Sequence, residues 1–146
     1  MGYNIQGAFS GGGGGGGQSV STAQTIVSSG GHITTTATSF TDATGITLTL
    51  PSTGGTLDCL CNSMQSVTID VTDSLRFALV KDTTALTYAT QDPPNVGEYT
   101  SLNVTCLADG DGDTLKLQWS TAGGNTGTIR VTSAWATPTI SAFAVG

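Results

Sequence analysis

Residues 46–50 alternate strictly between apolar and hydroxyl side chains, in the order Ile-Thr-Leu-Thr-Leu. This alternation places the apolar groups on one face of a β-strand and the hydroxyls on the other. The segment ends at residues 51–55, Pro-Ser-Thr-Gly-Gly, a combination typical of a turn. The whole chain contains 27 threonines, whose β-branched side chains suit a strand better than a helix. These features favour an all-β protein.

The same kind of pattern recurs along the chain, with Gly, Pro, Asn and Asp between the repeats and no segment of helical period. About nine short strands at regular spacing are typical of a sandwich or jelly roll, so we expect a jelly-roll-like antiparallel β-sandwich. The predicted strands are 33–40, 46–50, 57–61, 67–71, 75–80, 102–107, 115–119, 129–134 and 139–145. The positions expected to face inward are Ile46, Leu48, Leu50, Val67, Ile69, Val71, Leu75, Phe77, Leu79, Leu115, Leu117 and Trp119.

The N-terminal part of the chain differs in composition from the rest. Seven consecutive glycines occupy residues 11–17, and the first charged residue is Asp42. A glycine run has high backbone entropy and no side chains to bury, so we expect a flexible arm at residues 1–31 and the sandwich at residues 32–146.

Ahead of the glycines, Tyr3, Ile5 and Phe9 lie in phase for a strand. We interpret them as an anchor that binds a partner's sheet or groove, because a disordered tail, which is the alternative, needs no apolar groups.

Charge excludes some partners. The net charge is −6, and the four basic residues Arg76, Lys81, Lys116 and Arg130 are scattered singly. Binding to nucleic acid or to an anionic membrane surface needs several clustered cations, so neither is expected. The longest apolar run, residues 77–80, is too short to span a bilayer, and residues 1–10 lack the regions of a secretory signal.

Three cysteines, Cys59, Cys61 and Cys106, give an odd count. Cys59 and Cys61 are two residues apart in a predicted strand, so they share a face and are poorly placed to bridge each other. We expect small buried side chains, while a disulfide from Cys106 to one of the other two stays open. A metal site would need further Cys or His ligands. This cysteine usage fits synthesis in a reducing cytoplasm.

No catalytic constellation is recognisable. The single histidine, His32, follows two glycines, and no G-x-S-x-G motif accompanies it. The acids fall mostly at turn-like positions, such as Asp42, Asp73, Asp82 and Asp92, where capping backbone amides is their ordinary role. We therefore expect a protein that is not an enzyme and has no organic cofactor.

One acidic cluster suggests a metal. Asp109, Asp111 and Asp113 alternate with glycines, and such a loop can direct oxygen ligands toward calcium. The EF-hand spacing is not matched, because Thr114 and Ser120 stand where glycine and glutamate belong. The favoured interpretation is a plain hairpin loop between the strands on either side, with calcium as the alternative.

Four segments resemble the β-sandwich modules of tailed-bacteriophage virion proteins, including head-decoration proteins and fibre tips. They are residues 34–52, 75–82, 127–130 and 139–145. The likeness extends from residue 33 to the C-terminus, but residues 57–61 depart from the more apolar, β-branched strand of similar modules. It implies a jelly-roll-like fold, trimeric in similar proteins, on the outside of a virus particle.

These observations together predict a capsid decoration (cement) protein, made in the host cytoplasm and located on the capsid exterior. It would attach through its arm to the major capsid protein or another virion protein and stabilise the shell as a homotrimer. The lack of a shaft repeat favours this over a fibre tip.

The alternative is a short tail or head fibre adhesin whose exposed loops bind a host-surface glycan or protein, with the loop aromatics Tyr88, Tyr99 and Trp135 as candidate contacts. A secreted ligand of the TNF or C1q type is a third hypothesis, and the missing signal and unpaired cysteines count against it.

Overall fold

The structure, a computed structural model, describes residues 21–25, 31–52, 58–92, 95–131 and 137–145. Within these ranges the chain forms ten strands and no helix. No helix in this described part is therefore long or apolar enough to cross a membrane. The strands are β1 (Ser21–Thr25), β2 (Ile33–Thr35), β3 (Thr41–Thr49), β4 (Asp58–Ile69), β5 (Leu75–Lys81), β6 (Thr84–Gln91), β7 (Thr100–Asp109), β8 (Thr114–Thr121), β9 (Gly127–Ile129) and β10 (Thr139–Val145).

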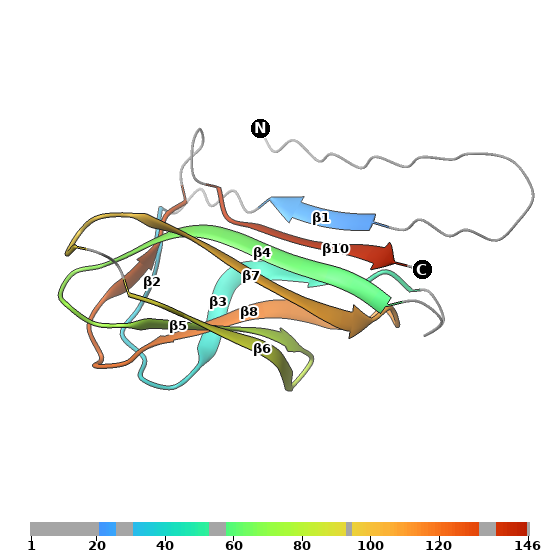
Figure 1. Ribbon diagram of the computed structural model, residues 1–146, viewed down its shortest axis with the longest axis horizontal. Helices are drawn as coiled ribbons and strands as arrows, with labels where there is room; N and C mark the ends of the chain where they lie inside the picture. Colours follow the sequence, from blue (N-terminus) through green and yellow to red (C-terminus); the bar gives the residue numbers. More distant parts are fainter. Residues whose placement is uncertain (1–20, 26–30, 53–57, 93–94, 132–136, 146) are drawn as a thin grey trace, which may run out of the picture.

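The strands form two sheets, both antiparallel, that pack face to face (Figure 1). Sheet A has the order β1-β10-β4-β9-β2, with β7 paired to β4 as its sixth strand. Sheet B has the order β3-β8-β5-β6. The expected jelly-roll-like β-sandwich is thus confirmed.

β4 organises sheet A. One edge of β4 pairs with β10 along residues 58–64 and then with β9 along residues 67–69, while the other edge pairs with β7. The sequence predicted two strands here, at 57–61 and 67–71, because residues 62–66 are mostly polar. That prediction is wrong, since β4 runs without a break from Asp58 to Ile69. Ser63 within it is buried, and its hydroxyl lies 3.0 Å from Gln65 Oε1 and 3.1 Å from the Thr139 carbonyl oxygen, either of which can accept its proton. Hydrogen-bonded polar side chains can continue a strand through a core.

The core lies between the sheets. Its largest members, Phe77 and Trp119, face each other across β5 and β8 with ring centroids 6.1 Å apart. All the positions predicted to face inward are buried except Val71, which is 42% exposed because β4 ends at Ile69 and the chain then turns. Aromatic and aliphatic burial of this kind supplies most of the free energy of folding.

Several strand boundaries differ from the sequence prediction. β6 was not predicted, because its alternation of alanine and threonine is weak and it lies at the edge of sheet B, where burial is partial. β2 stops at Thr35, five residues short of the predicted end, and β9 ends at Ile129. β10 occupies the predicted range.

Two expectations about connections need correction. The segments flanking residues 110–113 were expected to form a hairpin, yet β7 belongs to sheet A and β8 to sheet B, so this loop crosses between the sheets. Asp-Gly sequences favour a tight reversal but do not dictate which strands pair. In addition, β1 falls within the range 1–31 expected to be an arm, and it pairs with β10 in sheet A. The sheet therefore begins before the predicted domain boundary.

Candidate interaction surface

An exposed apolar row crosses the outer face of sheet A. Phe143 of β10 is the cross-strand partner of Leu60 of β4, and Leu60 in turn is the partner of Leu107 of β7. Their side chains are 45%, 40% and 57% exposed, respectively. Three large apolar groups thus lie side by side on three adjacent strands, in contact range of one another.

Strand alternation accounts for this exposure. The neighbours of these residues, Cys61, Ala142 and Ala108, point into the core and are buried. Two further outward positions, Met64 on β4 beyond Asn62 and Val145 on β10, are also apolar and exposed. We call Leu60, Met64, Leu107, Phe143 and Val145 the apolar face of sheet A. Contiguous exposed apolar groups on a soluble protein commonly mark an interaction site.

The remainder of this face is polar but carries little charge. The amide of Asn62 donates to the Thr105 hydroxyl at 3.5 Å, and that hydroxyl lies 3.4 Å from Asn103 Oδ1. Asp58 and Asp109 are cross-strand partners at one end of the face. Within β4, β7 and β10 there is no lysine, arginine or histidine. Such a face can be covered by another protein surface without desolvating cations.

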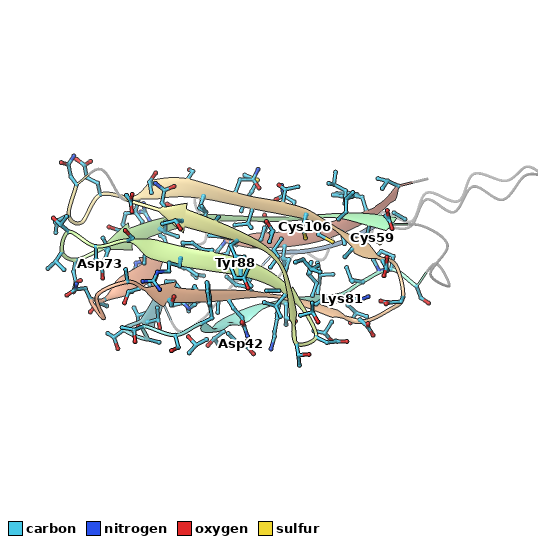
Figure 2. All side chains as sticks on the ribbon, turned by 60° about the horizontal axis from the view of Figure 1, so that its bottom comes forward. Asp42, Cys59, Asp73, Lys81, Tyr88 and Cys106 are labelled. Atoms are coloured by element: carbon cyan, nitrogen blue, oxygen red, sulfur yellow. The ribbon has the colours of Figure 1, made fainter. Side chains whose placement is uncertain are left out.

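The outer face of sheet B differs. Asp42 of β3 is labelled in Figure 2. Its carboxylate accepts hydrogen bonds from the Gln118 amide at 2.7 Å and from the Lys116 ammonium at 3.0 Å, and both donors are on β8. The hydrogen bond from Gln118, followed by that from Lys116, lowers the pKa of Asp42. On this face the charges of Asp42 and Lys116 are therefore paired with each other.

An aromatic pair lies on the same face of sheet B. Tyr88 of β6 is 67% exposed, and its ring centroid is 5.7 Å from that of Phe40. Register pairing links Asp42 to Gln118, Gln118 to Ala78, and Ala78 to Tyr88, so Tyr88 and Asp42 are in one cross-strand row. The sequence had suggested Tyr88 as a loop aromatic, but it lies within a strand.

Tyr99 lies apart from Tyr88, just before β7. The Arg130 guanidinium is 4.8 Å from the centroid of the Tyr99 ring, and His32 is a further neighbour at 6.2 Å between ring centroids. The Nδ1 atom of His32 accepts a hydrogen bond from the backbone N–H of Val131 at 3.1 Å. His32 thus has a structural contact at the start of the domain.

The acidic loop is organised around a lysine. The Lys81 ammonium pairs with Asp111 and also with Asp113, the latter at 3.4 Å. The hydrogen bond from Lys81 lowers the pKa of Asp111, while desolvation and then the nearby Asp111 raise the pKa of Asp113. Among the residues that the structure describes, no group of three or more acidic, histidine or cysteine side chains is arranged to hold a metal ion. This geometry lends no support to calcium at Asp109, Asp111 and Asp113.

The anchor residues Tyr3, Ile5 and Phe9, like Trp135, lie outside the described residues. The apolar face of sheet A was not predicted from the sequence. The sequence does indicate it, because β10 and β7 carry apolar residues at both odd and even positions, which point to opposite faces of the sheet. Ile140 and Phe143 point to opposite faces, as do Val104 and Leu107. Apolar residues on both faces of adjacent strands indicate that both faces are to be covered.

Comparison with known proteins identifies a fold and no family. No family model matches the chain, and no curated protein matches it. Among solved structures, it is similar to the Eiger TNF of S. frugiperda with a TM-score of 0.55 and 9% identity, covering 88% of this chain and 93% of that one. This likeness supports the jelly-roll fold alone.

Two weaker likenesses have TM-scores below 0.5, and we draw nothing from them. The sugar-binding EclA C-terminal domain has a TM-score of 0.38 and 12% identity, covering 79% of this chain and 76% of its own. The VP2 subviral particle of infectious bursal disease virus has a TM-score of 0.36 and 10% identity, covering 87% of this chain and 40% of the VP2 chain.

Proposed function

We propose that this chain is a structural protein of a virus particle, a decoration protein on the outside of a tailed-bacteriophage capsid. In this role the chain associates with copies of itself through the apolar face of sheet A and attaches to the capsid through its N-terminal arm. The single observation that carries the proposal is the exposed row of Phe143, Leu60 and Leu107. The sequence resemblance to phage virion modules supplies the location on the capsid exterior.

The character of the face supports a second copy of the chain as its occupant. Burial of apolar area is the main favourable term in association, at about 25 cal/mol per Å². The net charge of −6 does not oppose contact here, because acidic groups on the face are confined to its end, at Asp58 and Asp109. In an oligomer with closed symmetry, the same apolar face is buried on every subunit. We propose a homotrimer, the state that the sequence resemblance implies.

The oligomer is tested by introducing charge into the apolar face. Leu107→Glu and Phe143→Glu should each weaken self-association by roughly 100-fold or more, because a carboxylate would be buried without a partner. The matched control is Tyr88→Glu, which adds the same charge at an exposed position of sheet B. Sedimentation velocity on the full chain reports the mass. Equal behaviour of all three variants would exclude this face as the interface.

Capsid attachment is tested separately through the arm. A chain lacking residues 2–17 should keep its fold and its oligomeric state, and it should no longer bind capsids that lack the decoration protein. The substitutions Tyr3→Ser, Ile5→Ser and Phe9→Ser in the full chain should reduce binding in the same assay, because they remove the apolar groups and leave the glycines. Undiminished capsid binding by the deletion variant would contradict the role of the arm.

A second function, adhesion to a host-surface glycan or protein, is favoured by Tyr88. Its exposed ring lies in one cross-strand row with the carboxylate of Asp42 and the amide of Gln118. An aromatic face beside hydrogen-bonding groups suits a saccharide or a polar peptide. If the protein is an adhesin, it should bind host cells and compete with infection, and Tyr88→Ala should lose both effects. Capsid binding without cell binding would favour decoration.

A further inference from the structure

Two of the three cysteines face each other in sheet A. Cys61 of β4 and Cys106 of β7 are direct cross-strand partners. Cys61 is fully buried, whereas Cys106 is half-buried, and both lie on the inner side of the sheet. Directly opposed residues of antiparallel strands have Cα atoms about 4.5–5.5 Å apart, which lies within the range that a disulfide spans. Cys59, in contrast, is opposite Ala108 and Ala144.

We propose that Cys61 and Cys106 form a disulfide when the folded chain meets a small disulfide oxidant such as oxidised glutathione, and that this bond fastens β7 to β4. In this structure both cysteines are free thiols. The reduced form belongs to a reducing compartment, and the disulfide belongs to an oxidising one. The disulfide does not depend on the proposed function, so either can fail without the other.

The surroundings of the thiols indicate how the bond forms. A hydrogen bond between the two side chains is the largest influence on both, raising the pKa of Cys61 and lowering the pKa of Cys106. Cys106 is also the more exposed of the two. Because the thiolate is the attacking species, Cys106 is suited to react first with the external disulfide. Cys61 completes the exchange because it lies directly opposite Cys106.

The disulfide forms in two successive thiol–disulfide exchanges. The Cys106 thiolate attacks one sulfur of oxidised glutathione, which forms a mixed disulfide and releases a glutathione thiolate that takes up the proton lost by Cys106. The Cys61 thiolate then attacks the Cys106 sulfur, and the second glutathione leaves as a thiolate that takes up the proton of Cys61. The protein loses two protons and two electrons, which together are two hydrogen atoms, and one molecule of oxidised glutathione becomes two molecules of the reduced form.

The Cys61–Cys106 bond would lie next to the apolar face of sheet A. β7 pairs with β4 and with no other strand among the described residues. Leu60 and Leu107, the adjacent register pair, form part of the apolar face of sheet A on the other side of the same two strands. A covalent link at the next residue pair fixes the register that holds these two leucines together. Where the proposed self-association holds, oxidation therefore also strengthens the oligomer.

The test is oxidation of the native full chain with oxidised glutathione, followed by alkylation, intact mass measurement and peptide mapping. The expected product has lost two hydrogen atoms, links Cys61 to Cys106, and leaves Cys59 alkylatable after unfolding. Its Tm should exceed that of the reduced chain by about 10 °C, because the bond closes a long loop. Cys59→Ala should preserve the product, whereas Cys106→Ala should abolish it.

Peptide mapping of the oxidised wild-type chain identifies the linked cysteines without any variant. The test therefore still holds if Cys106→Ala fails to fold. Retention of all three thiols by the native chain, under conditions in which the urea-unfolded chain oxidises, would overturn the proposal. A link between Cys59 and Cys106 would overturn it as well. An unchanged Tm after formation of the Cys61–Cys106 bond would refute the fastening of β7.

Discussion

The carboxylate of Asp73 accepts the backbone N–H of Gly123, with N–O distances of 2.9 Å to Oδ1 and 2.8 Å to Oδ2. The same carboxylate accepts the backbone N–H of Ser74 at 2.7 Å and the Asn125 amide at 3.2 Å. Asp73 lies in the connection from β4 to β5, and Gly123 lies in that from β8 to β9. Both connections pass from one sheet to the other. The Asp73 side chain therefore links the two connections that cross between the sheets.

Loss of this carboxylate should destabilise the fold. We expect Asp73→Ala to lower the free energy of unfolding by about 2 kcal/mol, since hydrogen bonds to a charged group are worth about 1.5–3 kcal/mol and the loop amides lose their acceptor. Urea denaturation of the purified chain measures the change. Asp92→Ala, which removes an exposed aspartate at the end of β6, is the control and should change stability by less than about 0.5 kcal/mol. Equal effects of the two substitutions would contradict the role of Asp73.

Stability should also fall in acid because of Asp73. Although desolvation raises its pKa, the hydrogen bonds from Gly123, Ser74 and Asn125 together lower it below the ordinary value of 3.8. A group whose pKa is lower in the folded state stabilises the fold at pH values above its unfolded pKa, and this contribution is lost as pH falls toward the folded pKa.

The unfolding free energy should therefore decline between about pH 5 and pH 2, and the decline should be shallower in Asp73→Asn. Asp42, whose pKa is also lowered, contributes with the same sign and remains in that variant. Parallel pH profiles for the wild-type chain and Asp73→Asn would show that Asp73 makes no such contribution.

Local pattern predicts much of this fold but not the way its strands are paired. The alternation around Leu48 and Leu79 indicates inward faces because side-chain direction along a strand has a fixed period. Pairing depends on contacts between segments distant in the chain. The residues flanking the loop at Gly112 therefore resemble a hairpin although they belong to different sheets. The apolar face of sheet A was missed for the same reason, because Leu60, Leu107 and Phe143 become neighbours only when three strands align.

Gly127 of β9 occupies a position that excludes a side chain. A Cβ atom there would lie 2.5 Å from Leu75 Cδ2 and 3.2 Å from Thr121 Cγ2, and both neighbours are fully buried. We expect Gly127→Ala to destabilise the fold by about 1–3 kcal/mol, the usual cost of overpacking a core. Thermal unfolding followed by circular dichroism measures the loss.

A double-mutant cycle distinguishes overpacking from a general intolerance of β9. Leu75→Ala removes the atom that a Cβ at position 127 would meet, so adding Gly127→Ala to that variant should cost much less than it does in the wild-type chain. If the losses of unfolding free energy in the two single variants simply add in the double variant, the contact with Leu75 is not the cause.

Lys81 pairs with Asp111 and Asp113, two of the three aspartates that the calcium hypothesis requires as ligands. A cation that binds only the folded state raises Tm, and the rise grows with the ratio of its concentration to its dissociation constant. Because the Lys81 ammonium already pairs with both carboxylates, we expect millimolar calcium and an excess of chelator to leave the Tm of the wild-type chain unchanged. Lys81→Met should change the stability of the fold only slightly, since ion pairs at the surface are screened by solvent. A rise in Tm with calcium that disappears in Asp109→Asn and Asp113→Asn would instead establish the metal site.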